Sequence, residues 1–262
     1  MILRRLPQHI KDQNWFAVAL DFVIVVAGIL LAFQVTNWSE VRGEKAALAR
    51  AEVAITGDLI DSYVNVKERN ALSECRKLGL RALGERLLQP GDNWEAAPHS
   101  SNDTELAAFP AVVRYPKRFW KDRIWETELA RGSFDLMDPE RRRDIDLIFG
   151  AVKAMGHFQS AAGDNESRLK ILGQANELSR AERHKLFEII SILDEQSVAL
   201  HMIGQNIVDE IEGLNLTLND GERKALGERF SILNTSASAS YADCRTPITT
   251  PFLDELGVGD TP

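Results

Sequence analysis

The stretch FVIVVAGILLAFQV, residues 22–35, decides how this chain is built. A helix that crosses the hydrocarbon core of a bilayer needs about 20 mostly apolar residues. The run reaches that length when it is extended backward to Trp15, and Asp21 is the one charged residue within it. Asp21 lies near the inner end, where a carboxylate costs less than at the midplane. We therefore predict one uncleaved transmembrane helix over residues 15–38.

The charges that flank the run predict its orientation. The head, residues 1–14, carries three basic residues and one acid, whereas the outer flank mixes both signs. The excess of Lys and Arg on the cytoplasmic side predicts a cytoplasmic head and an exoplasmic remainder. The whole chain has a net charge of -8; the head contributes +2, so the remainder carries -10. An acidic surface suits neither nucleic acid nor anionic headgroups, so we expect membrane lipid around the anchor and no nucleic acid as a partner.

Two other interpretations of the apolar run stay open. A basic head before an apolar core is also the pattern of a cleaved signal peptide, although no small-x-small cleavage site follows it here. A helix buried in the core of a soluble protein is the second alternative.

One face of the predicted span carries small residues. At about 100° per residue, Asp21, Val25, Gly28, Ala32 and Val35 lie on the same side of the helix. Gly28 and Ala32 form a small-xxx-small pair, which lets a second helix approach closely. Two interpretations of this face stay open. It either contacts a second copy or another envelope membrane protein, with Asp21 making a polar contact, or it touches lipid.

The sequence GILLAFQVTNWSE, residues 28–40, resembles the signature of an uncharacterised bacterial family of single-span membrane proteins. Members of that family begin with one span that ends in a G-I-x-x-A-x-Q-x-x-N-W-x-E pattern, and a helical domain follows. The resemblance covers about residues 12–45. The family has no assigned activity, so the resemblance implies no catalytic residue. It implies a bacterial inner-membrane protein with a periplasmic domain, and the flanking charges place its N-terminus in the cytoplasm.

Gln34, Asn37 and Trp38 belong to this signature and lie at the outer boundary of the predicted span. Gln34 and Asn37 are three residues apart, so their amides lie on one helix face. They can bind lipid headgroups, the helix ends of a partner, or water. Trp38 is expected to fix the depth of the helix, since aromatic rings gather at membrane interfaces. We favour plain interfacial anchoring for this motif.

The region after the span, residues 39–234, is predicted to be all-α: a periplasmic bundle with long helices. Apolar residues recur at helical spacing, and no alternation of strands and helices is present. We expect the first helix to continue from the span to about Leu88, followed by a loop over 89–117. The aromatic residues over 109–125 are expected in the core; a ligand-binding wall or a partner surface is the alternative. The tail, residues 235–262, is predicted to be poorly ordered except for a tether at Cys244.

Two helix starts and one seam are marked by local patterns. Asp138 before Pro139 is a typical N-cap, and Ser179 with Glu182 forms a capping box. The helix after Ser179 repeats an apolar residue every seven positions, at Leu186, Leu193, Leu200, Ile207 and Leu214. Gly204, between two of these positions, permits close helix approach. Such a seam packs either within one bundle or between molecules.

Cys75 and Cys244 are the only cysteines. If the domain is exoplasmic, both face an oxidising compartment. We predict a structural disulfide that pins the tail to the first long helix and contributes up to about 5 kcal/mol. Two free thiols, or a reactive Cys244, are the alternatives.

The sequence carries no pattern typical of catalysis. The five histidines are scattered, and no H-E-x-x-H, C-x-x-C, G-x-S-x-G or phosphate-binding loop is present. We therefore expect no cofactor, no metal site and no enzymatic activity. The leading hypothesis is an anchored interaction or assembly module. The alternative is a ligand-sensing domain that signals through a membrane partner, and an enzyme of unrecognised type comes third.

Overall fold

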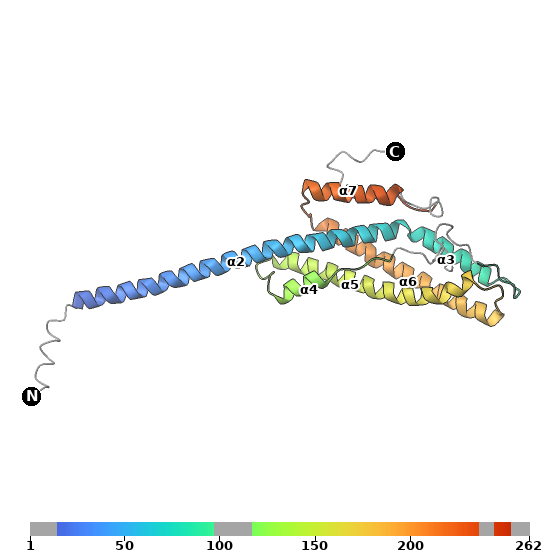
Figure 1. Cartoon of the computed structure of the whole chain (residues 1–262), viewed down its shortest axis with the longest axis horizontal. Coiled ribbons are helices and arrows are strands. Elements are labelled where there is room, and N and C mark those ends of the chain that lie inside the picture. The colour runs from blue at the N-terminus through green and yellow to red at the C-terminus, as the bar shows by residue number, and fades with distance from the viewer. Residues whose placement is uncertain (1–14, 97–116, 236–243, 253–262) are drawn as a thin grey trace, which may run out of the picture.

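The computed structural model describes residues 15–96, 117–235 and 244–252, with side chains from residue 19 onward (Figure 1). The prediction of an all-α fold is confirmed, since every named element in these ranges is a helix. The elements are α2 (Trp15–Ala71), α3 (Ser73–Leu87), α4 (Arg123–Ala130), α5 (Pro139–Arg168), the short 3-10 helix η2 (Leu169–Gly173), α6 (Arg180–Gly213) and α7 (Asp220–Thr235).

The longest element, α2, has two parts with different surroundings. It contains 57 residues, which corresponds to about 85 Å of helix. Its N-terminal part projects away from all other helices (Figure 1), and its first buried residue is Ala51. From there on Ile55, Leu59, Tyr63 and Val66 are buried in the bundle. One continuous helix therefore forms both the projecting rod and a wall of the core.

The core lies between the second half of α2, α3, α5 and α6. The helices α5 and α6 lie side by side, and α6 also packs against α2 and α3 (Figure 1). The predicted seven-residue seam of α6 is buried at Leu186, Leu193, Leu200 and Ile207, and Leu214 is partly buried. The seam is therefore filled from within the chain, which decides between the two alternatives in favour of the ordinary core of one bundle.

Both predicted helix starts are confirmed. The Asp138 side chain accepts hydrogen bonds from the backbone N–H groups of Glu140 (3.1 Å) and Arg141 (3.0 Å), and α5 begins at Pro139. Ser179 and Glu182 form the reciprocal capping box at the start of α6. These motifs satisfy backbone donors that have no partner inside the first turn of a helix.

The predicted unbroken continuation of the first helix is wrong at one point. The helix α2 ends at Ala71 and α3 begins at Ser73, because Leu72 adopts φ -102° and ψ 1°. The carbonyls near the break find other partners. The Ser73 hydroxyl donates to the Asn70 carbonyl over 2.8 Å, and the Thr246 N–H donates to the Ala71 carbonyl over 3.0 Å. A segment from the far end of the chain thus stabilises the break.

Part of the predicted loose tail is packed. Ile248 and Thr250 are buried. The Asn234 amide donates to the Ile248 carbonyl over 3.0 Å, and its Oδ1 accepts from the Ile248 N–H over 3.0 Å. We call residues 244–252 the strap, because they connect α7 with α2 and α3. The strap has no helical periodicity, so its order depends on contacts that the local sequence does not reveal.

The aromatic segment divides between core and surface. Trp125 is buried and stacks on Phe134 (4.7 Å between ring centroids) and on Phe149 (5.5 Å), as expected for a core ring. Trp120 is partly buried. Phe119 is 92% exposed, so its predicted place in the core is wrong. Two further rings of this segment, Phe109 and Tyr115, lie outside the described residues.

Candidate functional site

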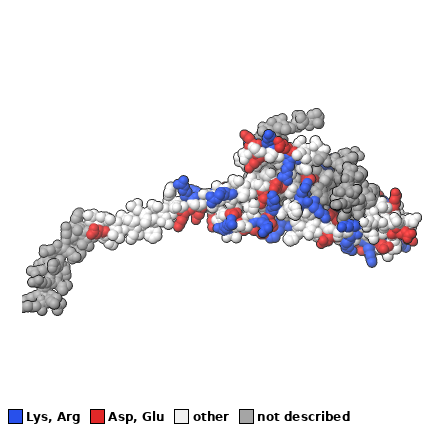
Figure 2. Space-filling view, in the orientation of Figure 1, with Lys and Arg blue, Asp and Glu red and all other residues white. Residues whose placement is uncertain are grey.

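The projecting part of α2 is long and apolar enough to cross a membrane. Its described side chains from residue 19 to residue 46 are all exposed, including Phe22, Leu31 and Phe33. Figure 2 shows an uncharged stretch of this helix between its N-terminal end and the charged surface of the bundle. Leaving a large apolar side chain in water forgoes about 1.5–3 kcal/mol per residue, so this stretch requires cover from lipid or from another protein.

The predicted contact face lies wholly on this exposed stretch. Asp21, Gly28 and Ala32 are exposed, and a Cβ added at Gly28 would meet no atom within 4 Å. The Thr36 hydroxyl donates to the Ala32 carbonyl over 3.0 Å, so this polar group is satisfied within the helix. The fold brings none of the described residues of other elements against this face.

The interfacial motif lies where the apolar stretch ends. Gln34, Asn37 and Trp38 are exposed, and the Arg42 guanidinium lies 5.4 Å from the centroid of the Trp38 ring. A cation over an indole face is weakly attractive in water and more so where water is scarce. The pair therefore combines an amphipathic ring with a positive charge one helical turn further from the apolar stretch.

A helical stalk separates this motif from the bundle. Trp38 and Ala51 are 13 residues apart on the same helix, which corresponds to about 20 Å. The stalk carries charges of both signs, among them Glu40, Arg42 and Lys45. Because α2 has no break before Leu72, the direction of the projecting rod also sets the direction of one wall of the core.

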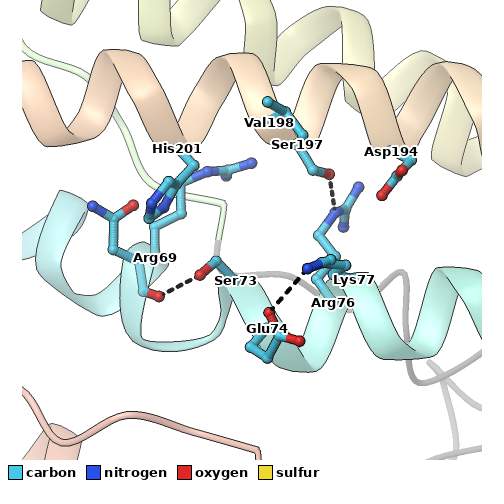
Figure 3. A pocket seen from close by; sticks show the side chains of 10 residues that line it. Arg69, Ser73, Glu74, Arg76, Lys77, Asp194, Ser197, Val198 and His201 are labelled. Atoms are coloured by element: carbon cyan, nitrogen blue, oxygen red, sulfur yellow. Dashed lines mark hydrogen bonds and ion pairs between the residues drawn. The ribbon is translucent and has the colours of Figure 1, made fainter.

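A cavity of about 270 Å³ lies where α2 gives way to α3, facing α6 (Figure 3). Arg69, Asn70 and Lys77 line it from one side, and Ser197, Val198 and His201 line it from α6. Its volume is slightly below the range of about 300–1,000 Å³ that is usual for small-molecule sites in proteins. Sequence reasoning missed this cavity, because it exists only where the helix breaks.

A buried charge cluster fixes one wall of that cavity. The Arg76 Nε donates to the Ser197 Oγ over 2.9 Å, and its Nη2 lies 2.9 Å from the Glu166 Oε1. The side chains of Arg76 and Glu166 are 2% and 5% exposed. Lys117 Nζ also lies 2.9 Å from the second Glu166 oxygen. Opposite charges this close attract each other strongly where water is excluded, so the cluster ties α3, α5 and α6 together.

The strap is attached to both sides of the helix break. Cys75 of α3 and Cys244 form a disulfide with Cα atoms 5.0 Å apart. On α2, the Tyr63 hydroxyl lies 2.6 Å from the Glu212 Oε1 and 2.8 Å from the Thr250 Oγ1. A carboxylate only accepts, and a phenol carries one proton. Tyr63 therefore donates to Glu212 and accepts from Thr250.

Histidines and acids are not gathered for metal binding in the described part of the chain. No group of three or more His, Cys, Asp or Glu side chains there is arranged to hold a metal ion. His201 borders the cavity at the helix break, and His184 lies 3.5 Å from Glu188 on the surface of α6.

Comparisons with models of protein families, with curated proteins and with solved structures found no match to this chain.

Proposed function

We propose that this chain is a membrane-anchored assembly module. In this proposal α2 holds the helical bundle in the periplasm of a bacterium, and the anchor associates laterally with a second copy or with another envelope membrane protein. The observation that carries the proposal is the exposed, small-residue face of α2 on a helix that continues into the core. A contact made by the exposed face of α2 therefore acts on the same helix that forms one wall of the core.

Packing arguments favour this face over the rest of the molecule. Helices in lipid associate where small residues let their backbones approach, and Gly28 and Ala32 supply such a pair. A carboxylate within a membrane helix usually faces a partner or water, and Asp21 lies on the same side of the helix. The apolar seam of α6 is filled inside the bundle, so it does not compete as a surface for association.

The proposed placement rests on two further observations. The excess of basic residues in the head favours a cytoplasmic N-terminus. The disulfide between Cys75 and Cys244 is typical of an oxidising compartment such as the periplasm. The resemblance of residues 28–40 to the bacterial single-span family is consistent with both.

The lateral contact is tested by native mass measurement of the full-length protein in mild detergent. We expect a defined complex that Gly28→Leu and Ala32→Leu weaken. Ala27→Leu is the matched control, because it adds the same bulk as Ala32→Leu but about 140° around the helix from Ala32. A wild-type monomer would contradict the proposal, and so would an equal loss of assembly in the Ala27→Leu variant.

The anchor itself is tested by fractionation. We expect the protein, with its N-terminus intact, to stay in carbonate-washed membranes, and protease added outside intact spheroplasts to reach the bundle. Recovery in the soluble fraction, or protection of the bundle from the protease, would contradict the proposed placement.

Ligand sensing is a second candidate function, favoured by the cavity in Figure 3. A ligand there would touch Arg69 and Asn70, in the last turn of the helix that also forms the anchor. Binding at this point would change the direction of α2. The anchor would pass that change to a partner protein in the membrane. A metabolite that raises the unfolding temperature of the wild type, and fails to do so in a Val198→Trp variant, would support sensing. No shift across a broad metabolite set would count against it.

A further inference from the structure

The exposed side of α2 carries small residues well beyond the anchor. They recur every eleven residues, a repeat that corresponds to three helical turns of about 3.67 residues each. Three successive repeats fill the same three positions, and eight of the nine residues are Gly, Ala, Ser or Val: Gly28, Ala32 and Val35; Ser39, Gly43 and Ala46; Arg50, Ala54 and Gly57. We call these nine residues the repeat face. It runs through the anchor and the stalk and ends on the bundle.

The fold leaves the repeat face open. The core residue Ile55 lies 27 positions after Gly28, which places it about 180° around the helix. The repeat face is therefore opposite the side of α2 that packs into the bundle. A Cβ added at Gly28, Gly43 or Gly57 would meet no atom within 4 Å, and Val53, beside the repeat face, is 72% exposed. A second backbone can approach α2 closely at these glycines.

The bundle end of the repeat face borders apolar surface. Gly57 lines a cavity of about 350 Å³ between α2 and α7, together with Ile60 and Leu218. A helix that follows the repeat face to this point would remove apolar surface from water. Arg50 is the one charged residue of the face. It lines a groove with Glu128 of its own chain, so its charge is offset within the molecule.

The charges of the stalk are divided between the two flanks of the repeat face. Relative to Gly28, Arg42 and Lys45 lie about 40° and 100° to one side, whereas Glu40 and Glu44 lie about 120° and 160° to the other. When two identical helices pack in parallel, a twofold axis brings the basic flank of each beside the acidic flank of the other. Exposed ion pairs of this kind contribute little affinity, but they select the partner.

We propose that the repeat face binds a second copy of this chain, so that two α2 helices pack in parallel from Gly28 to Gly57. This inference rests on the lateral contact proposed for the anchor, and it names the partner in that contact. Two copies carry the same flanking charges and insert in the same direction. Each position therefore faces its own counterpart at the same height. The contact extends over about 45 Å of helix, and the two bundles lie on the outside.

A second copy meets each demand that the repeat face makes on a partner. The partner must be a helix as long as the anchor and the stalk together. It must carry small residues at the same spacing, and its acidic flank must meet the basic flank of α2. Because about 3.67 residues per turn is close to the 3.6 of a free helix, two such helices wind around each other only slightly and stay in contact along their length.

The test is thiol cross-linking of the full-length protein in membranes. The two native cysteines are bonded to each other, so a cysteine introduced on α2 supplies the reactive thiol. We expect Ala46→Cys and Val53→Cys to form cross-linked dimers with a bismaleimide whose spacer is shorter than the diameter of one helix. Glu44→Cys is the matched control, because Glu44 is exposed and lies about 160° around the helix from Ala46. Ala46→Cys should react at least about tenfold faster than Glu44→Cys, since thiols held side by side react faster than thiols that meet by diffusion.

Native mass measurement of the wild type in mild detergent separates this inference from the lateral contact itself. A dimer of this chain, with rapid cross-linking of Ala46→Cys, would support the parallel packing. A dimer that cross-links at neither Ala46→Cys nor Val53→Cys, or equally fast at Glu44→Cys, would overturn the packing and leave the contact at the anchor standing. A complex with a different protein and no second copy would overturn the choice of partner alone, and a monomer would overturn both. Circular dichroism shows whether each variant is folded.

Discussion

Gly204 of α6 faces Val66 of α2 so closely that a Cβ added at Gly204 would lie 2.9 Å from the Val66 Cγ1. Real Cβ atoms do not make contacts of that length, so either the valine or the helices would have to move. Val66 is fully buried and packed, which leaves it little room. The missing side chain at position 204 therefore sets the separation between α6 and the helix that forms the anchor.

The first prediction concerns this contact. Gly204→Ala is expected to lower the free energy of unfolding by about 1–3 kcal/mol, as overpacking of a core typically does. Gly150→Ala on α5 is the matched control, because a Cβ there meets nothing within 4 Å. It should be neutral or stabilise by up to about 1 kcal/mol, the difference in helix propensity. Chemical denaturation of the full-length protein measures both, and equal stabilities would contradict the prediction.

The disulfide gives a second prediction. Cys244→Ser is expected to destabilise the fold by about 2–4 kcal/mol, because the bridge closes a loop between residues 169 positions apart. In the wild type we expect no thiol to react with an alkylating reagent before reduction, and two to react after reduction in denaturant. Mass spectrometry counts the modified thiols. Two alkylated thiols without reductant would show that the bridge is not formed.

The buried charge cluster gives a third prediction. Glu166→Gln removes the carboxylate that pairs with the buried Arg76, so we expect a loss of about 3–5 kcal/mol in the free energy of unfolding. Glu126→Gln is the control. It removes the exposed contact between Glu126 and Lys153 (2.7 Å), and surface pairs of this kind contribute little. The same denaturation experiment compares the two variants, and a tolerated Glu166→Gln would mean that the cluster does not stabilise the bundle.

Asp58 predicts an unusual pH dependence. Burial raises the pKa of Asp58 above its usual value of 3.8; Lys121 opposes this shift and Asp61 adds to it. A carboxyl group with a raised pKa in the folded state contributes stability below the unfolded pKa and loses it as the pH rises through the folded pKa. Asp58→Asn cannot ionise. It should therefore be more stable than the wild type at about pH 7, with a difference that shrinks as the pH falls toward 3.8.

Asp61 should show the opposite sign. Burial alone would raise the pKa of Asp61, but hydrogen bonds from Lys121 and Arg229 outweigh it, and the pKa is lowered below 3.8. Such a group stabilises the fold above its unfolded pKa and loses that effect as the pH falls through the folded pKa. Asp61→Asn should thus destabilise the protein at neutral pH and have little effect in strong acid. Denaturation curves for both variants across this pH range provide the check. If both variants changed the free energy of unfolding in the same direction at neutral pH, the opposite pKa shifts of Asp58 and Asp61 would be contradicted.

Local sequence patterns were sufficient for much of the fold. Helix periodicity identified the all-α class, and the caps at Asp138 and Ser179 located two helix starts, because a cap depends on residues within one turn of each other. The seam through Leu193 identified the buried face of α6 for the same reason. The exposure of single side chains was harder to predict. Phe119 is apolar but lies on the surface. Its segment has no periodicity, so the sequence does not indicate which way the ring faces.

Tertiary structure decided the features that connect distant parts of the chain. The break after Ala71 is supported by Thr246, and no pattern near residue 72 indicates it. The buried Asp58 Oδ2 lacks a hydrogen-bond partner, while Lys121 and Arg229, from two other segments, both bind Asp61. The sequence by itself determined a long apolar helix, the caps and the seam, since those follow from short-range backbone and side-chain geometry. The cavities, the strap and the charge clusters required the fold, since contacts between distant residues form only when the helices pack.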